Sequence, residues 1–497
     1  MNDAMFAMWR GRCALQSGCC AVAGAALLSG CALIHHDSDA VPQVEAASVQ
    51  VSPKLNLPTG DWPSDKWWLQ YDDPQLTAFI DRALVASPTM ALARQRVAQA
   101  QAQAELAVAA AGPQLAATGA IDRERVSSHG FLSAYAGSDP AIGANGPWYT
   151  TGLVGFDGAW DLDIWGRHRA EIAATMGVQN AQKAEEAEVA LELSTDIARI
   201  YYVVQTARSE IDLLKQQRDA ISIEVDAQRS RFARGLEPDT TAKQAEAKLL
   251  TVDQQIAQTS EQVTNGRESL RALIGADSGA LGNMAPQPLS IVATGVPDNL
   301  GFQLLARRPD LQALHWYVVS SLKRVDAAKA AFYPSFDIKA FFGFNALNLS
   351  QLFLHASQQI NIAPGLYLPV FDSGRLNASL GGERASSNAT ILQYNQAVLN
   401  AVRDVAQNGS ALKDLGERTA IQQKKLQDVQ FVFDSASARY RRGLVDRLQV
   451  EEARESAIQE QLALLELTGQ RLQTSIALTK TLGGGYQATI DAQSQSR

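Results

Sequence analysis

The sequence is defined first by what is scarce in it. All four cysteines lie in the first 31 of the 497 residues, at positions 13, 19, 20 and 31. The body of the protein therefore carries no disulfide framework, no cysteine-based metal site and no thiol nucleophile. The six histidines are scattered without an i, i+4 helical pair, and no glycine-rich phosphate loop follows a strand. With no nucleophile–base arrangement either, the sequence predicts neither an enzyme nor a cofactor.

Positive charge and proline are also in short supply. Lys and Arg number 44 against 52 Asp and Glu, which gives a net charge of -8. This acidic balance argues against nucleic acid as a partner. Proline is absent from residues 167–231 and 375–439. A continuous helix of about 65 residues would be roughly 97 Å long at 1.5 Å per residue, far longer than the helices of a globular core.

The two proline-free stretches belong to an internal repeat. A shift of 208 residues aligns them without a gap and places residues 166–167, 231–236 and 270–275 on residues 374–375, 439–444 and 478–483. The block before each stretch, residues 88–113 and 309–334, repeats with a shift of about 221. A repeat of this size predicts two copies of one structural unit.

Each arm carries an apolar residue at every seventh position. The phase holds Ile197, Val204, Ile211, Val225 and Phe232 in the first copy and Val398, Val405, Leu412, Leu426, Phe433 and Tyr440 in the second, with Arg218 and Thr419 as exceptions. A sustained period of seven predicts helices that supercoil with a left-handed twist. Gly235 and Gly443 then favour a left-handed C-cap and a return helix. On these features alone, an ordinary antiparallel coiled-coil hairpin is an alternative.

The N-terminus has the composition of a signal peptide. Arg10 and Arg12 precede an apolar run, residues 21–28, that is too short to span a bilayer as a mature helix. Leu28-Ser-Gly-Cys31 follows and resembles a bacterial lipoprotein signal. Cleavage would leave Cys31 as a lipidated first residue, and Ala32 after it favours the outer membrane. A plain signal peptide with an incidental Cys31 is the alternative.

Between the repeated blocks the apolar period changes from seven to two. Alternation predicts strands over about 114–125, 148–162, 335–345 and 359–371. Strands of about 10 residues can cross a bilayer when tilted. A half-buried soluble sheet is the alternative, but aromatic residues at the strand ends favour the membrane. Four strands cannot close a barrel, and open edges in lipid leave backbone groups without partners, so the chain must oligomerise.

Several motifs, in order along the chain, carry a family resemblance. They are WDLDIWGRHR (160–169), RPD (308–310), AFYP (331–334), FDSGR (371–375), RYRRGLVD (439–446) and LGGG (482–485). Together they resemble the TolC-like, OprM/NodT-type outer-membrane lipoprotein channels of tripartite efflux systems. The resemblance implies a mainly α chain with a membrane β part. Three chains would form a 12-stranded barrel in the outer membrane, four strands from each, and an α-helical barrel through the periplasm.

The resemblance also implies partners and a domain plan. A periplasmic adaptor protein and an inner-membrane RND-type pump would complete a path for small molecules, and the outer-membrane lipid would anchor the trimer. We expect a signal peptide (1–30), an extended segment held by buried tryptophans (31–74), two efflux repeats (75–285 and 286–485) with helical arms over 166–275 and 374–483, and a C-terminal tail (486–497). A duct for type I protein secretion, or a non-conducting periplasmic tether, are the alternatives.

By the same resemblance, the periplasmic tip carries the adaptor contacts and the gate. The two turns that would receive adaptor hairpins are Arg234-Gly235-Leu236 and Arg442-Gly443-Leu444. The gate candidates are Asp239, Tyr440, Asp446, Glu451 and Glu452, whose acids would repel one another unless paired with nearby arginines. Thr241 and Val445 depart from the family's best-known member, which has an acid and an arginine there, so the pairs stay open.

Overall fold

The computed structural model describes residues 37–44, 55–131, 133–139, 144–145, 147–277, 279, 281, 284–292, 294–297 and 300–487. The expected signal peptide and Cys31 lie outside these residues. The chain divides into two compact units. The first comprises residues up to Pro42, 99–180 and 316–392, and the second comprises residues 43–98, 181–315 and 393–497.

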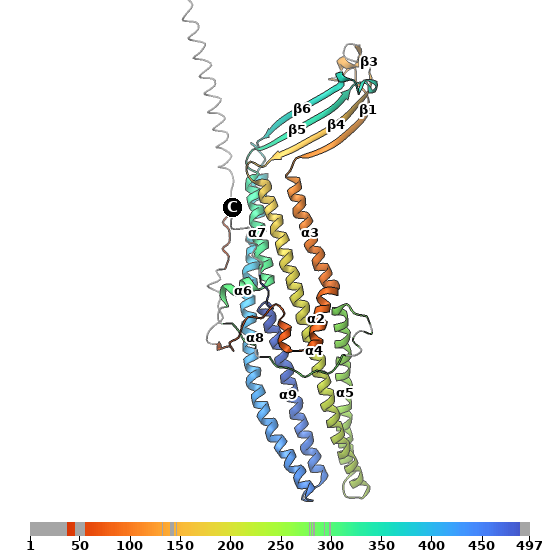
Figure 1. Cartoon of the computed structure of the whole chain (residues 1–497), viewed down its shortest axis with the longest axis vertical. Helices are drawn as coiled ribbons and strands as arrows, with labels where there is room; N and C mark the ends of the chain where they lie inside the picture. Colours follow the sequence, from red (N-terminus) through yellow and green to blue (C-terminus); the bar gives the residue numbers. More distant parts are fainter. Residues whose placement is uncertain are drawn as a thin grey trace, which may run out of the picture. The chain divides into compact units, whose positions relative to one another are not determined.

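The first unit is built around an antiparallel sheet. Its strands are β1 (Gln114–Arg125), β4 (Trp148–Leu162), β5 (Ser335–Ala346) and β6 (Gln358–Tyr367). They pair in the order β1-β4-β5-β6, so each repeat contributes two neighbouring strands (Figure 1). Two short strands, β2 (Ser138–Asp139) and β3 (Ala144–Asn145), pair in the connection between β1 and β4.

One expected strand boundary was wrong. The alternation around residue 370 predicted a strand ending at 371, whereas β6 ends at Tyr367. Pro369 follows two residues later and has no backbone N–H to donate to a ladder. Val370 and Phe371 are 73% and 88% exposed, so their apolar character reflects a surface outside the sheet.

The helices repeat with the same shifts as the sequence. The long helices α4 (Arg167–Ala233) and α8 (Arg375–Arg441) have 67 residues each, which corresponds to about 100 Å. Their return helices are α5 (Asp239–Ile274) and α9 (Arg447–Thr481). The shorter α3 (Pro88–Ala110) and α7 (Pro309–Ala330) precede β1 and β5. Helices α2 (Pro74–Ala86) and α6 (Gly301–Arg307) are the remaining α-helices of the described residues.

The core of the second unit is formed where the chain before α2 packs on the arms. Trp67 and Trp68 are 2% and 4% exposed, which confirms that this segment is held by buried tryptophans. They cluster with α2 residues, with Tyr201 and Tyr202 of α4, and with side chains of α5 and α9. Tyr201 Oη donates a hydrogen bond to Asp73, whose carboxylate also caps α2. The tyrosine hydroxyl is therefore satisfied inside the core.

The seven-residue seam is buried for most of its length. Ile197, Val204, Val398 and Val405 are at most 1% exposed. The exception Thr419 is also buried, and its hydroxyl donates to the Leu415 carbonyl at 2.6 Å. The exception Arg218 points to solvent and pairs with Asp253 of α5 at 2.6 Å. Both breaks in the period are thus accommodated without an unsatisfied polar group.

Within the described residues, no single helix has both the length and the apolar character needed to cross a membrane, although the bent pair α2 and α3 meets that test together.

Candidate functional site

The register of the sheet sorts its side chains onto two unlike faces. Directly paired residues share a face, so Phe156, Phe342 and Ile360 lie side by side. The same face carries Leu115, Ile121, Val154, Trp160, Phe336, Ile338, Phe344, Ile362 and Leu366. The opposite face carries Thr118, Asp122, Thr151, Asp157, Asp161, Asp337, Lys339, Asn345 and Asn361. The four strands therefore agree on one largely apolar face, with Arg123, Arg125 and Thr150 toward one end, and one largely polar face that also holds Leu153 and Phe341.

The apolar face is exposed although it is made of large side chains. Phe156, Phe342 and Ile362 are 51%, 52% and 70% exposed in the single chain. Polar-face groups bond across strands, as Thr118 does to Asp157 at 2.5 Å and Asn345 to Gln359 at 3.0 Å. A sheet with this arrangement can separate lipid on one side from water on the other.

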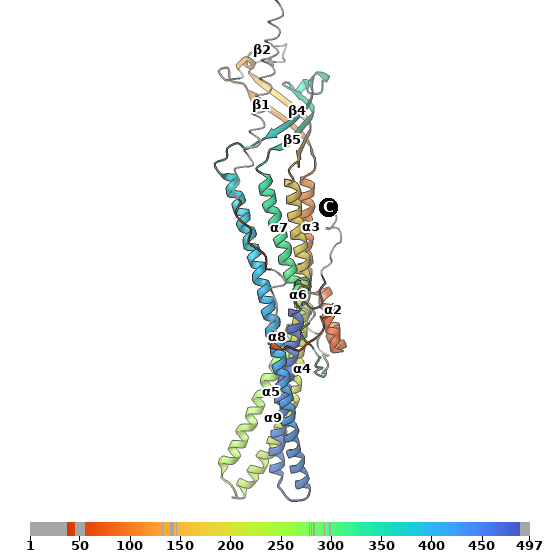
Figure 2. The same cartoon turned by 90° about the vertical axis from the view of Figure 1, so that its left-hand side faces the viewer.

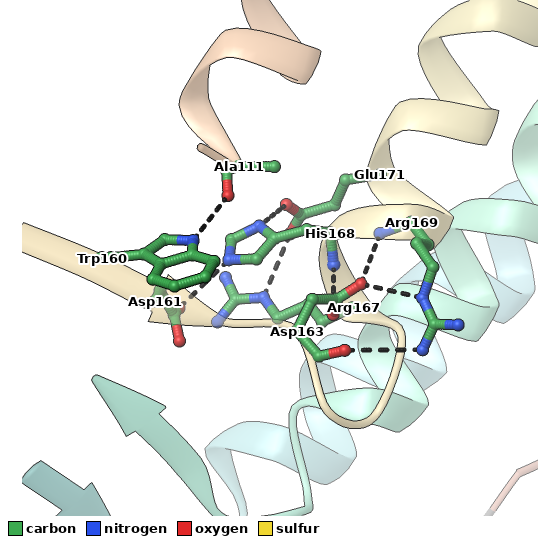
Figure 3. A network of polar contacts seen from close by, with 8 residues as sticks. All are labelled: Ala111, Trp160, Asp161, Asp163, Arg167, His168, Arg169 and Glu171. Carbon is green, nitrogen blue, oxygen red and sulfur yellow. Dashed lines mark hydrogen bonds and ion pairs between the residues drawn. The ribbon is translucent and has the colours of Figure 1, made fainter. Parts of the chain in front are cut away.

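A polar network joins β4 to α4 (Figure 3). The Asp163 carboxylate accepts hydrogen bonds from the backbone amides of His168 and Arg169, both at 3.0 Å, which caps the first turn of α4. Although burial raises the pKa of the Asp163 carboxyl, these bonds and the Arg169 guanidinium hold it below its usual value. His168 lies between Asp161 and Glu171, at 3.1 and 3.3 Å.

The second repeat uses the same device. Asp372 accepts hydrogen bonds from the amides of Gly374 and Leu376, and Gly374, like Gly166, has a positive φ. Asp163 and Asp372 therefore cap the first turns of α4 and α8, and Asp161 lies on the polar face of the sheet. Among the described residues, no group of three or more His, Cys, Asp or Glu side chains could hold a metal ion.

Both hairpin tips have one backbone geometry. In the first, the Leu236 amide donates to the Arg231 carbonyl and the Gly235 amide to the Phe232 carbonyl. In the second, Leu444 donates to Arg439 and Gly443 to Tyr440. This is the Schellman arrangement, which needs a left-handed residue, and Gly235 and Gly443 have φ of 69° and 75°. Figure 2 shows the two hairpins turning at the same end.

An arginine links the two hairpins at their tips. Arg231 of α4 donates through Nη2 to Asp446 Oδ2 at 3.0 Å and through Nη1 to Glu237 Oε1 at 3.2 Å. Asp446 also caps α9, because its Oδ1 accepts from the Gln449 amide at 3.0 Å. Releasing Asp446 would therefore loosen both the contact between hairpins and the start of α9.

The remaining gate candidates lie in different surroundings. Glu451 is buried, 3.5 Å from Arg447 Nε and 3.6 Å from Arg454 Nη1. Asp239 begins α5, Glu452 is exposed on α9 and Tyr440 is 44% exposed. Nowhere in the described chain does a side-chain hydrogen bond or ion pair hold these last three. The structure thus brings together Asp446 and Arg231, and it buries Glu451.

Comparison with known proteins finds close relatives over nearly the whole chain. The family described as "Outer membrane efflux protein" matches residues 79–276 and 300–484. The chain is 48% identical to the multidrug resistance outer membrane protein MdtP of Shigella flexneri over 470 residues, 94% of this chain and 96% of the relative. It is 40% identical to the multidrug resistance outer membrane protein MdtQ of Escherichia coli O6:H1 over 462 residues, 93% and 96% of the two chains.

A solved structure of an outer membrane protein has the same fold as this chain. The outer membrane protein VceC of Vibrio cholerae superposes with a TM-score of 0.76 at 27% sequence identity, covering 86% of this chain and all of that one. The likeness confirms the expected fold class, a mainly helical TolC-like chain with a four-stranded antiparallel sheet.

Proposed function

Because the chain belongs to the outer membrane efflux protein family and is an efflux channel of the outer membrane, we propose that three copies close their sheets into one 12-stranded barrel. The family is one of transport proteins, not of enzymes. The observation that carries the proposal is the sheet, in which β1 and β6 are edge strands and one face is largely apolar. Unpaired edges in lipid cost several kcal/mol for each backbone group, and pairing β1 with β6 of a neighbouring copy removes them.

In this arrangement the polar face lines a water-filled lumen and the helical arms extend it into the periplasm. The channel conducts passively, and the described residues of its wall offer hydrogen-bonding and charged groups to the molecules that pass. Relatives named for multidrug resistance support small toxic molecules as its cargo. A periplasmic adaptor protein and an inner-membrane RND-type pump deliver that cargo. The adaptor docks at the turns Arg234–Leu236 and Arg442–Leu444.

The tip is the gate of the resting channel. Arg231 and Asp446 hold the two hairpins of one chain together at 3.0 Å. Acids left exposed near the tip, Asp239 and Glu452, line the entrance, and Tyr440 lies on the same turn as Gly443. Opening breaks the Arg231–Asp446 contact.

Cys31 carries the lipid of a mature lipoprotein. Its support is the signal of residues 28–31. Each buried CH₂ contributes about 0.8 kcal/mol, so two or three acyl chains anchor firmly. Cys31→Ala should impair maturation, whereas a form with an ordinary cleavable signal should still make channels. Intact-mass analysis of the purified protein tests this, and an unmodified N-terminus at Cys31 would contradict it.

The trimer and its conduction are tested on purified protein. We expect a heat-resistant oligomer of three chains on a gel and discrete conductance steps in a planar bilayer. Expression in cells that lack their own efflux channels, together with a matching adaptor and pump, should lower drug accumulation. A stable monomer that conducts in detergent-free bilayers would contradict the barrel. Protein export without drug efflux would favour the secretion duct.

A further inference from the structure

A partly buried ionic cluster fixes the described N-terminal segment to the helices of the first unit. Arg384 of α8 donates two hydrogen bonds to the Asp37 carboxylate, Nε to Oδ1 at 2.7 Å and Nη2 to Oδ2 at 2.6 Å. Lys329 of α7 adds a contact to Oδ2 at 2.7 Å. The Arg384 side chain is 8% exposed and that of Asp37 is 16% exposed. Bidentate, charge-assisted bonds of this kind are strong and set geometry as well as energy.

The Arg384 guanidinium, aided by Lys329, holds the pKa of Asp37 far below its usual range although burial opposes this. The contacts therefore favour the charged form of the carboxylate. Removing Arg384 would leave Lys329 as the ionic partner of Asp37, so the bidentate geometry depends on Arg384.

The backbone of the segment is bound as well. Asn388, one turn beyond Arg384, accepts a hydrogen bond from the Val41 amide at 3.0 Å and donates one to the Asp39 carbonyl at 3.3 Å. In the second unit, Asn395 of the same helix accepts from the Val44 amide at 2.9 Å. Side-chain amides that pair with successive backbone groups fix the position of an extended segment along α8.

These contacts also give the segment a direction. Asp37 meets Arg384 and Val41 meets Asn388, so residue numbers rise together and the segment runs parallel to α8. Its upstream end therefore points toward Arg375, where α8 begins after the sheet. The clamp itself lies near that boundary.

The contact from α7 places the clamp in the same region. Lys329 is one residue before the end of α7, and β5 begins at Ser335. Asp37 is the sixth residue after Cys31. At no more than about 3.6 Å per residue, a lipid on Cys31 could lie at most about 21 Å from the clamp.

We propose that Arg384 and Lys329 are positioning residues that set the length of the lipid tether, so that the lipid holds the helical end of the sheet at the bilayer while the strands insert. This rests on the lipid attachment to Cys31 proposed above. Loss of the Asp37 contacts should also release Asp39 and Val41 from Asn388, which leaves Val44 as the next fixed point, so the tether grows from 6 to 13 residues. Effective concentration falls roughly as the -3/2 power of tether length, which is about threefold here.

The test compares Arg384→Ala in two backgrounds, the lipidated protein and a form with Cys31→Ser behind an ordinary cleavable signal. The readout is the rate at which heat-resistant trimer appears in membranes. We expect Arg384→Ala to slow assembly of the lipidated protein about threefold and to leave the non-lipidated form unchanged. Hydrogen exchange at Val41 should lose its protection in both forms. Arg418→Ala, an exposed arginine on the same helix, should alter neither measurement.

Two further variants guard against a folding defect. Asp37→Asn removes the charge without touching a helix, and the double change Asp37→Arg with Arg384→Asp should restore the rate. If Arg384→Ala slows both backgrounds equally, or neither, the residue is only structural and the clamp proposal is wrong. An intact mass showing no lipid on Cys31 would overturn the lipid attachment itself, and the clamp proposal with it.

Discussion

Two neighbouring residues of β6 offer a direct test of which face meets lipid. Ile362 is 70% exposed on the apolar face, opposite Ala340, and Asn361 is exposed on the polar face, opposite Phe341. Neither side chain is packed in the single chain, so arginine at either position should fit without disturbing the protomer. We expect Ile362→Arg to block assembly in the membrane and Asn361→Arg to permit it.

The expected size of the effect follows from position. Ile362 is the fifth residue of a 10-residue strand, near the middle of the bilayer. A lipid-facing arginine there costs about 2–4 kcal/mol. Since 1.4 kcal/mol is a factor of ten, one substituted chain loses about 30-fold to about 700-fold in its insertion equilibrium. A trimer carries the substitution three times, so its total penalty is roughly three times larger, whereas Asn361→Arg adds its charge to water.

Trimer content is measured by unheated gel electrophoresis of isolated outer membranes, with total protein determined after heating. Ile338→Arg, on the apolar face of the central strand β5, should behave like Ile362→Arg. Equal trimer yields for Ile362→Arg and Asn361→Arg would refute the assignment of faces. A greater loss for Asn361→Arg would reverse it.

Three other predictions concern the helical part. Gly443→Trp should abolish efflux without lowering trimer content, because it puts a large side chain at a left-handed residue of the tip where the adaptor docks. Gly416→Trp should keep efflux, because Gly416 lies within α8 away from the tip, although an added Cβ meets open space at either glycine. Asp446→Asn combined with Tyr440→Phe should raise resting single-channel conductance, because the charge that holds the first hairpin is lost; unchanged conductance would place the gate elsewhere. Burial, aided by the charge of Asp310, raises the pKa of Glu188 from 4.5 to about 7, so its contribution to stability is present below about pH 4.5 and lost as pH rises through about 7. Glu188→Gln should remove up to about 3 kcal/mol of that dependence, seen as a smaller fall in melting temperature between pH 5 and pH 8.

The helical arms could be predicted from the sequence because the residues that begin and end each helix are local signals, and both copies of the repeat carry them. Gly235 and Gly443 each end a helix at a left-handed residue, and an aspartate and a glycine precede each long helix. Arg218 and Thr419 interrupt the seven-residue period without breaking the helices. Arg218 pairs with Asp253 at the surface, and the Thr419 hydroxyl donates to a carbonyl of its own helix.

The sheet was predicted almost as well, because the alternation of apolar and polar residues along a strand assigns each side chain to a face before the neighbouring strand is known. Register then showed that the four strands place most of their large apolar residues on one side, although Leu153 and Phe341 lie on the other. The predicted strand extended too far, to Phe371, because apolar and polar residues continue to alternate past Pro369. The hydrogen-bonded pairing of β6 ends before that proline, at Tyr367.

Long-range side-chain contacts had no such signal. Arg231 and Asp446 were both expected at the tip, but they are 215 residues apart and nothing in the sequence assigned one to the other. The contact of Asp37 with Arg384 spans 347 residues and was not foreseen at all. Arg384 aligns with Met176 in the first copy, so the repeat itself gives no hint of the ion pair.

The equal lengths of α4 and α8 constrain how this protein can change over evolutionary time. One residue inserted into α4 alone would lower its tip by about 1.5 Å relative to that of α8 and rotate it by about 100°. Arg231 would then face away from Asp446. Growth and loss of residues must therefore be confined to the connections: the shift between copies is 221 for α3 and α7 but 208 for α4 and α8, a difference of 13 residues that arises beyond the helices. The lengths of α4 and α8 must therefore stay equal, and differences in length between the two copies are confined to the connections.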